Sequence, residues 1–172
     1  NDIFKIVEFL HVKPGKGPAF VRTKMKSVTS GKTLDNTFSA GHKIEVVRVE
    51  THTFQYLYNE GTDFHFMNTE TFEQITLDKN ILDAPDLLKE GTNVMVQINT
   101  ETESPLSVDM PASIVLEVTY TEPGVKGNTA TNATKPATVE TGATVNVPLF
   151  VNEGELIRVN AKTGEYVERV KE

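Results

Sequence analysis

The chain has 172 residues, of which 38% are hydrophobic, and it carries a formal net charge of −7 at pH 7. This length predicts one or two domains of ordinary size, and no run of residues approaches the roughly 18 apolar positions that a membrane-spanning helix needs. Because cysteine is absent, disulfides and thiolate metal sites are excluded, and a reducing cytoplasm is the compartment that fits.

The charge is unevenly distributed along the chain. Residues 1–47 carry eight lysines and arginines against four acidic residues, a net charge of +4. Residues 48–112 carry three against twelve, a net charge of −9, and residues 113–172 carry six against eight, a net charge of −2. A basic first third on an acidic chain indicates an anionic partner, most commonly nucleic acid, although a solvated basic face is the alternative.

Residues 1–47 are predicted to be all-β. Apolar or alternating segments, punctuated by glycine, predict strands at 3–12, 18–28, 33–39 and 43–49. Because the chain begins at Asn1, without methionine and already inside the first strand, we expect that N-terminal residues are missing from this sequence.

The first two strands are joined by a Pro-Gly turn that presents one lysine. Pro14 fixes φ for the second position of a turn, and Gly15 would supply the positive φ that a type II turn needs next. Gly17 allows a second bend, so Lys16 is predicted to project from the tip of the hairpin with nothing bulky beside it. A lysine at such a tip is usually only solvated, so the turn alone assigns it no function.

Residues 48–112 are predicted to form a small barrel of the five-stranded OB type. Its strands are expected at 54–58, 64–67, 70–77 and 94–98. Between the last two, 81–90 is predicted to be a helix, with Asp83 as its cap, Pro85 in its first turn and Gly91 after its end.

Residues 113–172 are predicted to form a third unit with similar strand-loop-strand spacing. A strand is expected at 113–120, followed by a long polar loop over 121–138. Further strands are expected at 137–140, 143–149, 156–160 and 165–170.

No constellation of catalytic residues is visible in the sequence. The four histidines show neither helical pairing nor ligand spacing, and the nucleophile, zinc and dinucleotide motifs are absent. The carboxylates of the middle third are spread along turns and strand ends, which is typical of a solvated surface. The sequence therefore predicts a protein that is not an enzyme and that uses neither a cofactor nor a metal.

Several blocks along the chain resemble bacterial elongation factor P. These blocks are KPGKG at 13–17 with AFVR at 19–22, YLYN at 56–59, HFMN at 65–68 with ETFEQ at 70–74, the spaced signature from Lys135 to Gly154, and GEYVERV at 164–170. The resemblance covers essentially all 172 residues.

The resemblance implies an all-β protein of three small β-barrel domains arranged in an L. An N-terminal SH3-like (KOW-type) domain, residues 1–47, would carry the lysine-tipped hairpin, with its first strands missing from this sequence. Two OB-fold domains would follow, an acidic one at residues 48–112 and a C-terminal one at residues 113–172.

The resemblance also implies a cytoplasmic, monomeric translation elongation factor with no membrane partner. Such a factor would bind the 70S ribosome, contact peptidyl-site tRNA and rRNA, and promote peptide-bond formation at consecutive prolines by positioning the tRNA end. In many members of the family the lysine that corresponds to Lys16 is modified after translation. A lysine-modifying enzyme that acts on Lys16 is therefore a further expected partner.

The residues expected to contact RNA follow from the resemblance. Lys16 would contact the tRNA terminus. The other RNA contacts of the hairpin would be Lys13, Pro14, Gly15, Gly17, Arg22, Lys24 and Lys26. In the third domain, Tyr166 and Arg169 would stack on and pair with tRNA or rRNA, whereas a packing pair at a strand edge is the alternative.

The family's loop that faces the small ribosomal subunit usually reads Gly-Asp-Thr. It corresponds here to Gly127, Asn128 and Thr129. Asn128 keeps a hydrogen-bonding side chain but removes the charge of the aspartate.

Two alternatives to the leading interpretation remain. The first is a paralogue that resembles elongation factor P but has a different role. The second is a generic OB protein that binds single-stranded nucleic acid, with ordinary salt dependence and no need for a ribosome.

Overall fold

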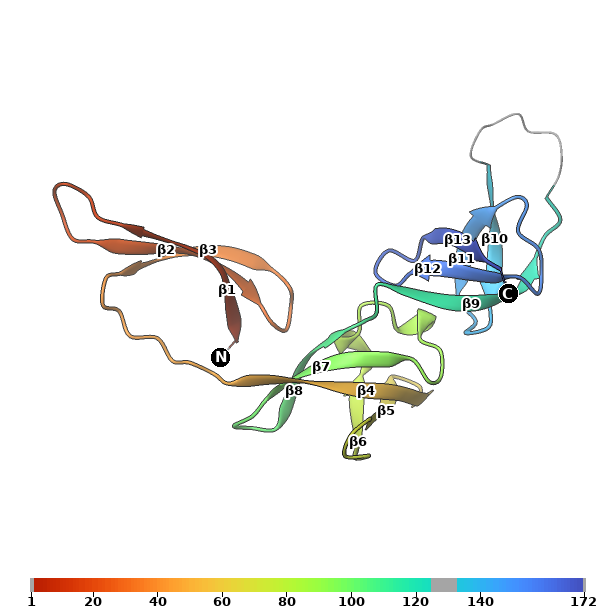
Figure 1. Cartoon of the computed structure of the whole chain (residues 1–172), viewed down its shortest axis with the longest axis horizontal. Helices are drawn as coiled ribbons and strands as arrows, with labels where there is room; N and C mark the ends of the chain where they lie inside the picture. The colour runs from red at the N-terminus through yellow and green to blue at the C-terminus, as the bar shows by residue number, and fades with distance from the viewer. Residues whose placement is uncertain (1, 125–132, 172) are drawn as a thin grey trace. The chain divides into compact units, whose positions relative to one another are not determined.

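The computed structural model describes residues 2–124 and 133–171 of the chain. They form three β-sheets, and helix is confined in these ranges to two short 3-10 turns (Figure 1). The all-β fold class is therefore confirmed. The chain divides into two compact units, Asn1–Thr51 with Gln97–Ser107 and His52–Val96 with Val108–Glu172. The division into three domains that end at residues 47 and 112 stays a prediction.

The first sheet has three antiparallel strands in the order β1-β2-β3. As predicted, its strands lie at Phe4–Val12 (β1), Phe20–Ser27 (β2) and Thr33–Ser39 (β3). The strand expected at 43–49 is wrong, because residues 42–48 form no strand and β4 begins at Val49. The apolar side chains of Ile44 and Val46 are exposed, so nothing in this segment favours pairing by burial.

The side chains of β2 point alternately to the two faces of the first sheet. Arg22, Lys24 and Lys26 are exposed on one face, whereas Thr23 and Ser27 on the other face are buried. The Thr23 hydroxyl donates to the carbonyl of Asn36 on β3 at 3.0 Å, which helps to hold the third strand in register.

The second sheet has five strands in the order β6-β5-β4-β7-β8. They are Val49–Glu60 (β4), Asp63–Asn68 (β5), Gln74–Asp78 (β6), Asn93–Asn99 (β7) and Ser104–Asp109 (β8). The predicted β4–β5 hairpin and β7 are confirmed, whereas β8 was not predicted. Strand β6 starts four residues later than expected, because Phe72 takes a left-handed φ of 61° and the Asn68 side chain accepts the Glu70 N–H at 2.8 Å.

Aromatic side chains make much of the core of this sheet. The rings of Tyr56 and Phe66 lie 5.5 Å apart, and those of Tyr56 and Phe64 lie 5.8 Å apart. All three residues are buried, together with Phe54, Leu77, Val94 and Val96. The alternation along β5, with Phe64 and Phe66 inward and His65 and Met67 outward, produces this core.

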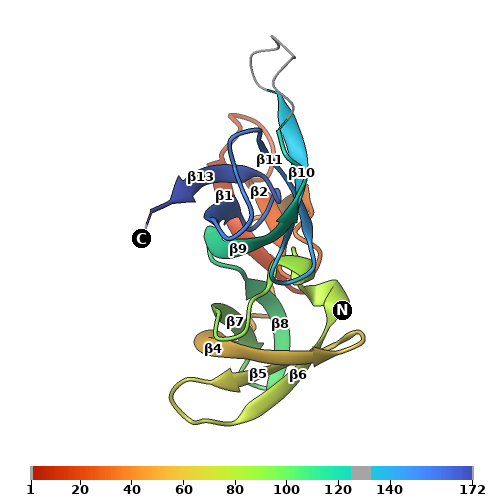
Figure 2. The same cartoon turned by 90° about the vertical axis from the view of Figure 1, so that its right-hand side faces the viewer.

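The third sheet also has five strands, in the order β11-β10-β9-β12-β13. They are Ser113–Thr121 (β9), Thr134–Val139 (β10), Thr144–Pro148 (β11), Leu156–Asn160 (β12) and Tyr166–Val170 (β13). Strand β9 lies in the middle and β13 at the edge, beside the C-terminus (Figure 2). The loop predicted over 121–138 is too long, because Thr121 pairs with Ala137 and residues 134–138 belong to β10.

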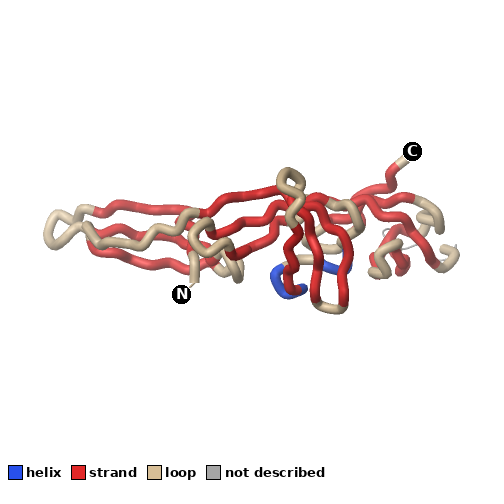
Figure 3. The backbone as a smooth tube through the Cα atoms, turned by 90° about the horizontal axis from the view of Figure 1, so that it is seen from below, coloured by secondary structure: helices blue, strands red, loops and turns tan. Residues whose placement is uncertain are grey.

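The helix predicted at 81–90 is wrong. Two 3-10 turns, Lys79–Ile81 (η1) and Pro85–Leu87 (η2), stand in its place (Figure 3). Pro85 disfavours helical backbone in the residue before it, and Ala84 accordingly has φ −142° and ψ 68°. No helix in the described ranges is long and apolar enough to cross a membrane.

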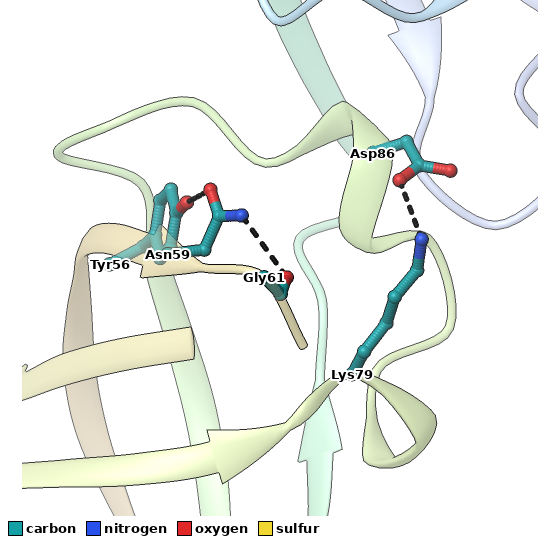
Figure 4. Close-up of polar contacts among 5 residues, drawn as sticks. All are labelled: Tyr56, Asn59, Gly61, Lys79 and Asp86. Atoms are coloured by element: carbon teal, nitrogen blue, oxygen red, sulfur yellow. Dashed lines mark hydrogen bonds and ion pairs between the residues drawn. The ribbon is translucent and has the colours of Figure 1, made fainter. Parts of the chain in front are cut away.

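Short polar contacts fix the turn between β4 and β5 and the two 3-10 turns (Figure 4). The Tyr56 hydroxyl donates to Asn59 Oδ1 at 2.9 Å, and Asn59 Nδ2 donates to the Gly61 carbonyl at 3.4 Å (Figure 4). Lys79 Nζ lies 3.0 Å from Asp86 Oδ1, an ion pair that joins the two 3-10 turns. Asp78, not the expected Asp83, caps the first turn by accepting the Asn80 N–H at 2.8 Å.

Candidate nucleic-acid interface

The loop between β1 and β2 is the tip of the first sheet, at the end opposite to the N-terminus (Figure 1, red). The last paired residues are Val12 and Phe20. The type II turn expected at Gly15 is wrong, because the left-handed residue of the loop is Gly17, with φ 108°. A Cβ on Gly17 would lie 4.0 Å from Pro14 Cγ, so the Pro14 ring faces back towards Gly17 across the loop.

Lys16 is exposed at this tip, as the sequence predicts. Its ammonium group has no hydrogen bond or ion pair with any residue in 2–124 or 133–171. A Cβ added to Gly15 would meet nothing within 4 Å, so the space beside Lys16 is open. Lys13 is exposed as well. The loop therefore presents the exposed Lys16 ammonium group at the end of the β1–β2 hairpin.

The expected basic row of β2 lies on one face of the first sheet. The Arg22 guanidinium carbon lies 5.7 Å from the centre of the Phe20 ring, within the range of a cation–π contact. Lys24 lies across from Glu8 on β1 and Asp35 on β3 in the ladder. The positive potential of this row is thus reduced around Lys24.

The structure brings Tyr166 and Arg169 close together near the edge of the third sheet. Burial raises the pKa of the Tyr166 hydroxyl, and the Arg169 guanidinium opposes that shift by favouring the phenolate. Arg169 Nη1 lies 2.9 Å from Glu155 Oε1, so its charge is already paired. A packing pair at a strand edge, the alternative left open by the sequence, therefore has some support in these contacts.

Two further residues belong to this cluster and were not predicted. The Arg169 guanidinium carbon lies 5.7 Å from the centre of the Phe150 ring. Glu155, in the same loop between β11 and β12, forms the ion pair with Arg169. Phe150 lies two residues after the end of β11, where the alternation of that strand has ended. An aromatic residue outside a strand pattern was the signal available in the sequence.

The expected subunit-facing residues Gly127, Asn128 and Thr129 lie outside the described residues. Both described ends of their segment are anchored. Buried Lys135 donates from Nζ to the carbonyl of Glu122 at 2.7 Å. Before the segment, a Cβ on Gly124 would lie 2.6 Å from the Leu149 carbonyl oxygen, so only glycine allows the backbone to pass this close to Leu149.

The described residues offer little for chemistry. They contain no group of three or more His, Asp or Glu side chains that could hold a metal ion. An open cavity of about 600 Å³ lies beside η2 and is lined by Asp83, Asp86 and Lys162 among others. Among the described residues, its walls contain no histidine, serine or cysteine.

Models of three protein-family domains match almost the whole chain. The elongation factor P KOW-like domain matches residues 1–44, and the elongation factor P OB domain matches residues 49–108. The elongation factor P C-terminal domain matches residues 114–169.

Full-length relatives agree with these domain matches. Elongation factor P of Flavobacterium johnsoniae is 81% identical over 172 residues, which cover 100% of this chain and 92% of that protein. Elongation factor P of Christiangramia forsetii is 71% identical over 172 residues, with the same coverage of 100% and 92%.

Among solved structures, the eukaryotic translation initiation factor 5A from Methanococcus jannaschii is similar with a TM-score of 0.47 and 23% identity, over 61% of this chain and 78% of that chain. A likeness this distant supports no conclusion about function.

The domain matches and the highly identical relatives show that this chain belongs to the elongation factor P family, and that it is a translation elongation factor and not an enzyme.

Proposed function

We propose that the protein binds the 70S ribosome beside peptidyl-tRNA and promotes peptide-bond formation at consecutive prolines, with Lys16 positioning the tRNA end. The observation that carries the proposal is the exposed ammonium group of Lys16, which has no partner among the described residues and stands on an open, glycine-bearing loop. A side chain that binds RNA through its charge must be exposed and must not already be paired with an acidic group. Lys16 satisfies both conditions among the described residues.

Positioning is sufficient for the proposed effect, because the ribosome itself carries out the reaction. Proline is a secondary amine with a fixed φ, so its nitrogen reaches a reactive geometry with difficulty. Holding reactants in a near-attack arrangement can supply about 7–11 kcal/mol in well-oriented intramolecular reactions. A fraction of that gain, delivered by one cation at the end of the peptidyl-tRNA, would relieve a stall.

We propose the remaining RNA contacts from the charge and exposure of the side chains and from the resemblance to the family. Lys13 provides a second cation beside the tip, and the row of Arg22, Lys24 and Lys26 meets phosphates along one face of the first sheet. In the C-terminal part, Tyr166 and Arg169 contact tRNA or rRNA. The three domains at residues 1–47, 48–112 and 113–172 would divide this work, with the acidic middle domain making the fewest contacts to RNA.

We also propose that a lysine-modifying enzyme extends Lys16 and that the protein works as a monomer in the cytoplasm, where ribosomes are. The exposed side chain at the tip is open to an enzyme, although Pro18 restricts which one can accept the loop. The intact mass of the protein purified from its native host should exceed the sequence mass, with the added group mapped to Lys16. A native protein with the unmodified mass and full activity would show that the bare lysine suffices.

The test of the proposed function is the Lys16→Ala variant in a translation reaction that encodes three consecutive prolines. We expect synthesis of this reporter to fall to the level seen without the factor, whereas a reporter without prolines is unaffected. The matched control is Lys43→Ala, which removes another exposed lysine of the same unit outside the loop. Full proline-reporter synthesis with Lys16→Ala would refute the proposal.

A further inference from the structure

An exposed aromatic ring lies beside the only arginine assigned to RNA contact in the third sheet. Phe150 is 58% exposed although it is a large apolar side chain. The Arg169 guanidinium stands over this ring at 5.7 Å, within cation–π range. Single exposed apolar residues are common on protein surfaces, so the exposure of Phe150 gains meaning only from its arginine neighbour.

Glu155 holds Arg169 in a fixed place. Its Oε1 accepts from Arg169 Nη1 at 2.9 Å, and its Oε2 accepts the backbone N–H of Asn152 at 2.9 Å. Both carboxylate oxygens are therefore occupied, and the carboxylate cannot rotate without losing a hydrogen bond. This arrangement orients the guanidinium before any ligand arrives, which lowers the entropy that binding would cost.

The guanidinium keeps donors to spare. Arginine has five N–H donors in a planar fork, and one from Nη1 is used by Glu155. In the described part of the chain, Nε and Nη2 of Arg169 have no hydrogen-bond partner. That edge of the guanidinium has the geometry that binds a phosphate with two parallel hydrogen bonds.

We propose that Phe150 and Arg169 form a subsite for one unstacked RNA nucleotide. The Phe150 ring takes the base by stacking, the Nε–Nη2 edge of Arg169 takes a phosphate oxygen pair, and Glu155 is the positioning residue that orients Arg169. This inference rests on the proposed RNA contact of Arg169 and adds to it a ligand class, a second binding residue and a positioning residue. Aromatic rings beside cations are the usual means by which proteins hold unpaired bases.

The first test compares Phe150→Leu and Phe150→Tyr for affinity to ribosomes that carry peptidyl-tRNA. We expect Phe150→Leu to weaken binding by about tenfold, a loss typical of removing the aromatic ring on which a base stacks. Phe150→Tyr should bind like the parent because it keeps the ring. The control is Phe72→Leu, which makes the same change at another exposed phenylalanine, in the loop between β5 and β6.

Salt dependence separates stacking from charge. Phe150→Leu should leave the slope of affinity against salt unchanged, because it removes no phosphate contact. Arg169→Gln should reduce the slope of log affinity against log salt concentration by about one, the change expected when one phosphate contact is lost. Thermal unfolding of each variant shows whether the third sheet remains intact. If Phe150→Leu unfolds, Arg169→Gln and Glu155→Gln still test the subsite.

The second test asks whether the substitution Glu155→Gln strengthens or weakens the affinity for ribosomes. Removing a carboxylate near RNA should strengthen binding if Glu155 acts only through its charge. A positioning residue predicts the reverse, so Glu155→Gln should weaken binding several-fold, and the double variant with Arg169→Gln should bind no worse than Arg169→Gln alone. The matched control is Glu168→Gln, which breaks a similar ion pair with Arg158 at 2.8 Å and should not weaken binding.

The outcomes distinguish this inference from the function on which it rests. Unchanged affinity of Phe150→Leu together with a weakened Arg169→Gln would overturn the nucleotide subsite but keep the RNA contact of Arg169. Tighter binding of Glu155→Gln would overturn its positioning role. Unchanged affinity of both Phe150→Leu and Arg169→Gln would remove RNA from this surface altogether, while the role of Lys16 would still be decided by the proline reporter.

Discussion

Lys16 owes its accessibility to the residues on either side of it. Gly15 leaves open space beside it, Gly17 bends the loop, and the exposed chain around it offers no acidic partner among the described residues. These features are local, so the sequence alone predicts them. Arg169 is different, because its partners Glu155 and Phe150 reach it from a loop that lies 14 and 19 positions earlier in the chain. Such a meeting depends on the pairing of β12 with β13, which residue patterns do not reveal.

At the residue scale, Tyr56 predicts a loss of stability at alkaline pH. Burial in the core raises the pKa of Tyr56, and the Glu90 carboxylate adds to the shift. The folded state therefore favours the neutral phenol, so this stabilisation is present below the ordinary tyrosine pKa of about 10 and is lost as pH rises through the raised pKa.

The variant that tests this is Tyr56→Phe. It should show a smaller loss of unfolding free energy above about pH 10 than the parent, and it should cost about 1 kcal/mol near neutral pH because the hydrogen bond to Asn59 is lost. Urea unfolding at several pH values measures both effects. Equal alkaline losses in variant and parent would assign the titration to another group.

At the element scale, the lysine hairpin depends on one glycine more than on the other. Gly17→Ala places a Cβ at φ 108° and should destabilise the loop by about 1 kcal/mol or more, with a matching loss of proline-reporter synthesis as Lys16 is displaced. Gly15→Ala is the control, because its φ is not in the left-handed range and its Cβ would meet nothing within 4 Å. Similar activity of the two variants would show that the bend at Gly17 does not place Lys16.

The same scale shows where prediction from sequence succeeds and fails. Strands with clear alternation, such as β2 and β5, are predictable because each buries one face. Strand β8 is not, because Ser104–Asp109 contains serine, proline and aspartate and becomes a strand through its neighbour β7. The apolar spacing over 81–90 imitates a helix, but Pro85 divides it into short turns.

At the scale of the whole molecule, charge is the property that the chain distributes most unevenly. The surplus of positive charge lies in residues 1–47 and the largest surplus of negative charge lies in residues 48–112. Attraction to RNA should therefore be concentrated on the first sheet, and acidic residues elsewhere should discourage binding to the phosphate backbone in other orientations. This distribution follows from the sequence alone, whereas the cluster around Arg169 required the structure.

The most direct test of the account places a crosslinker beside Lys16. Because the chain has no cysteine, Gly15→Cys introduces a single reactive thiol at an open position and keeps Lys16 itself. Thr33→Cys, exposed near the other end of the first sheet, is the matched control. With a short photocrosslinker on ribosomes stalled at consecutive prolines, we predict crosslinks from position 15, and none from position 33, to the terminal nucleotides of peptidyl-site tRNA. Crosslinks from position 15 that avoid the tRNA end would contradict the central claim.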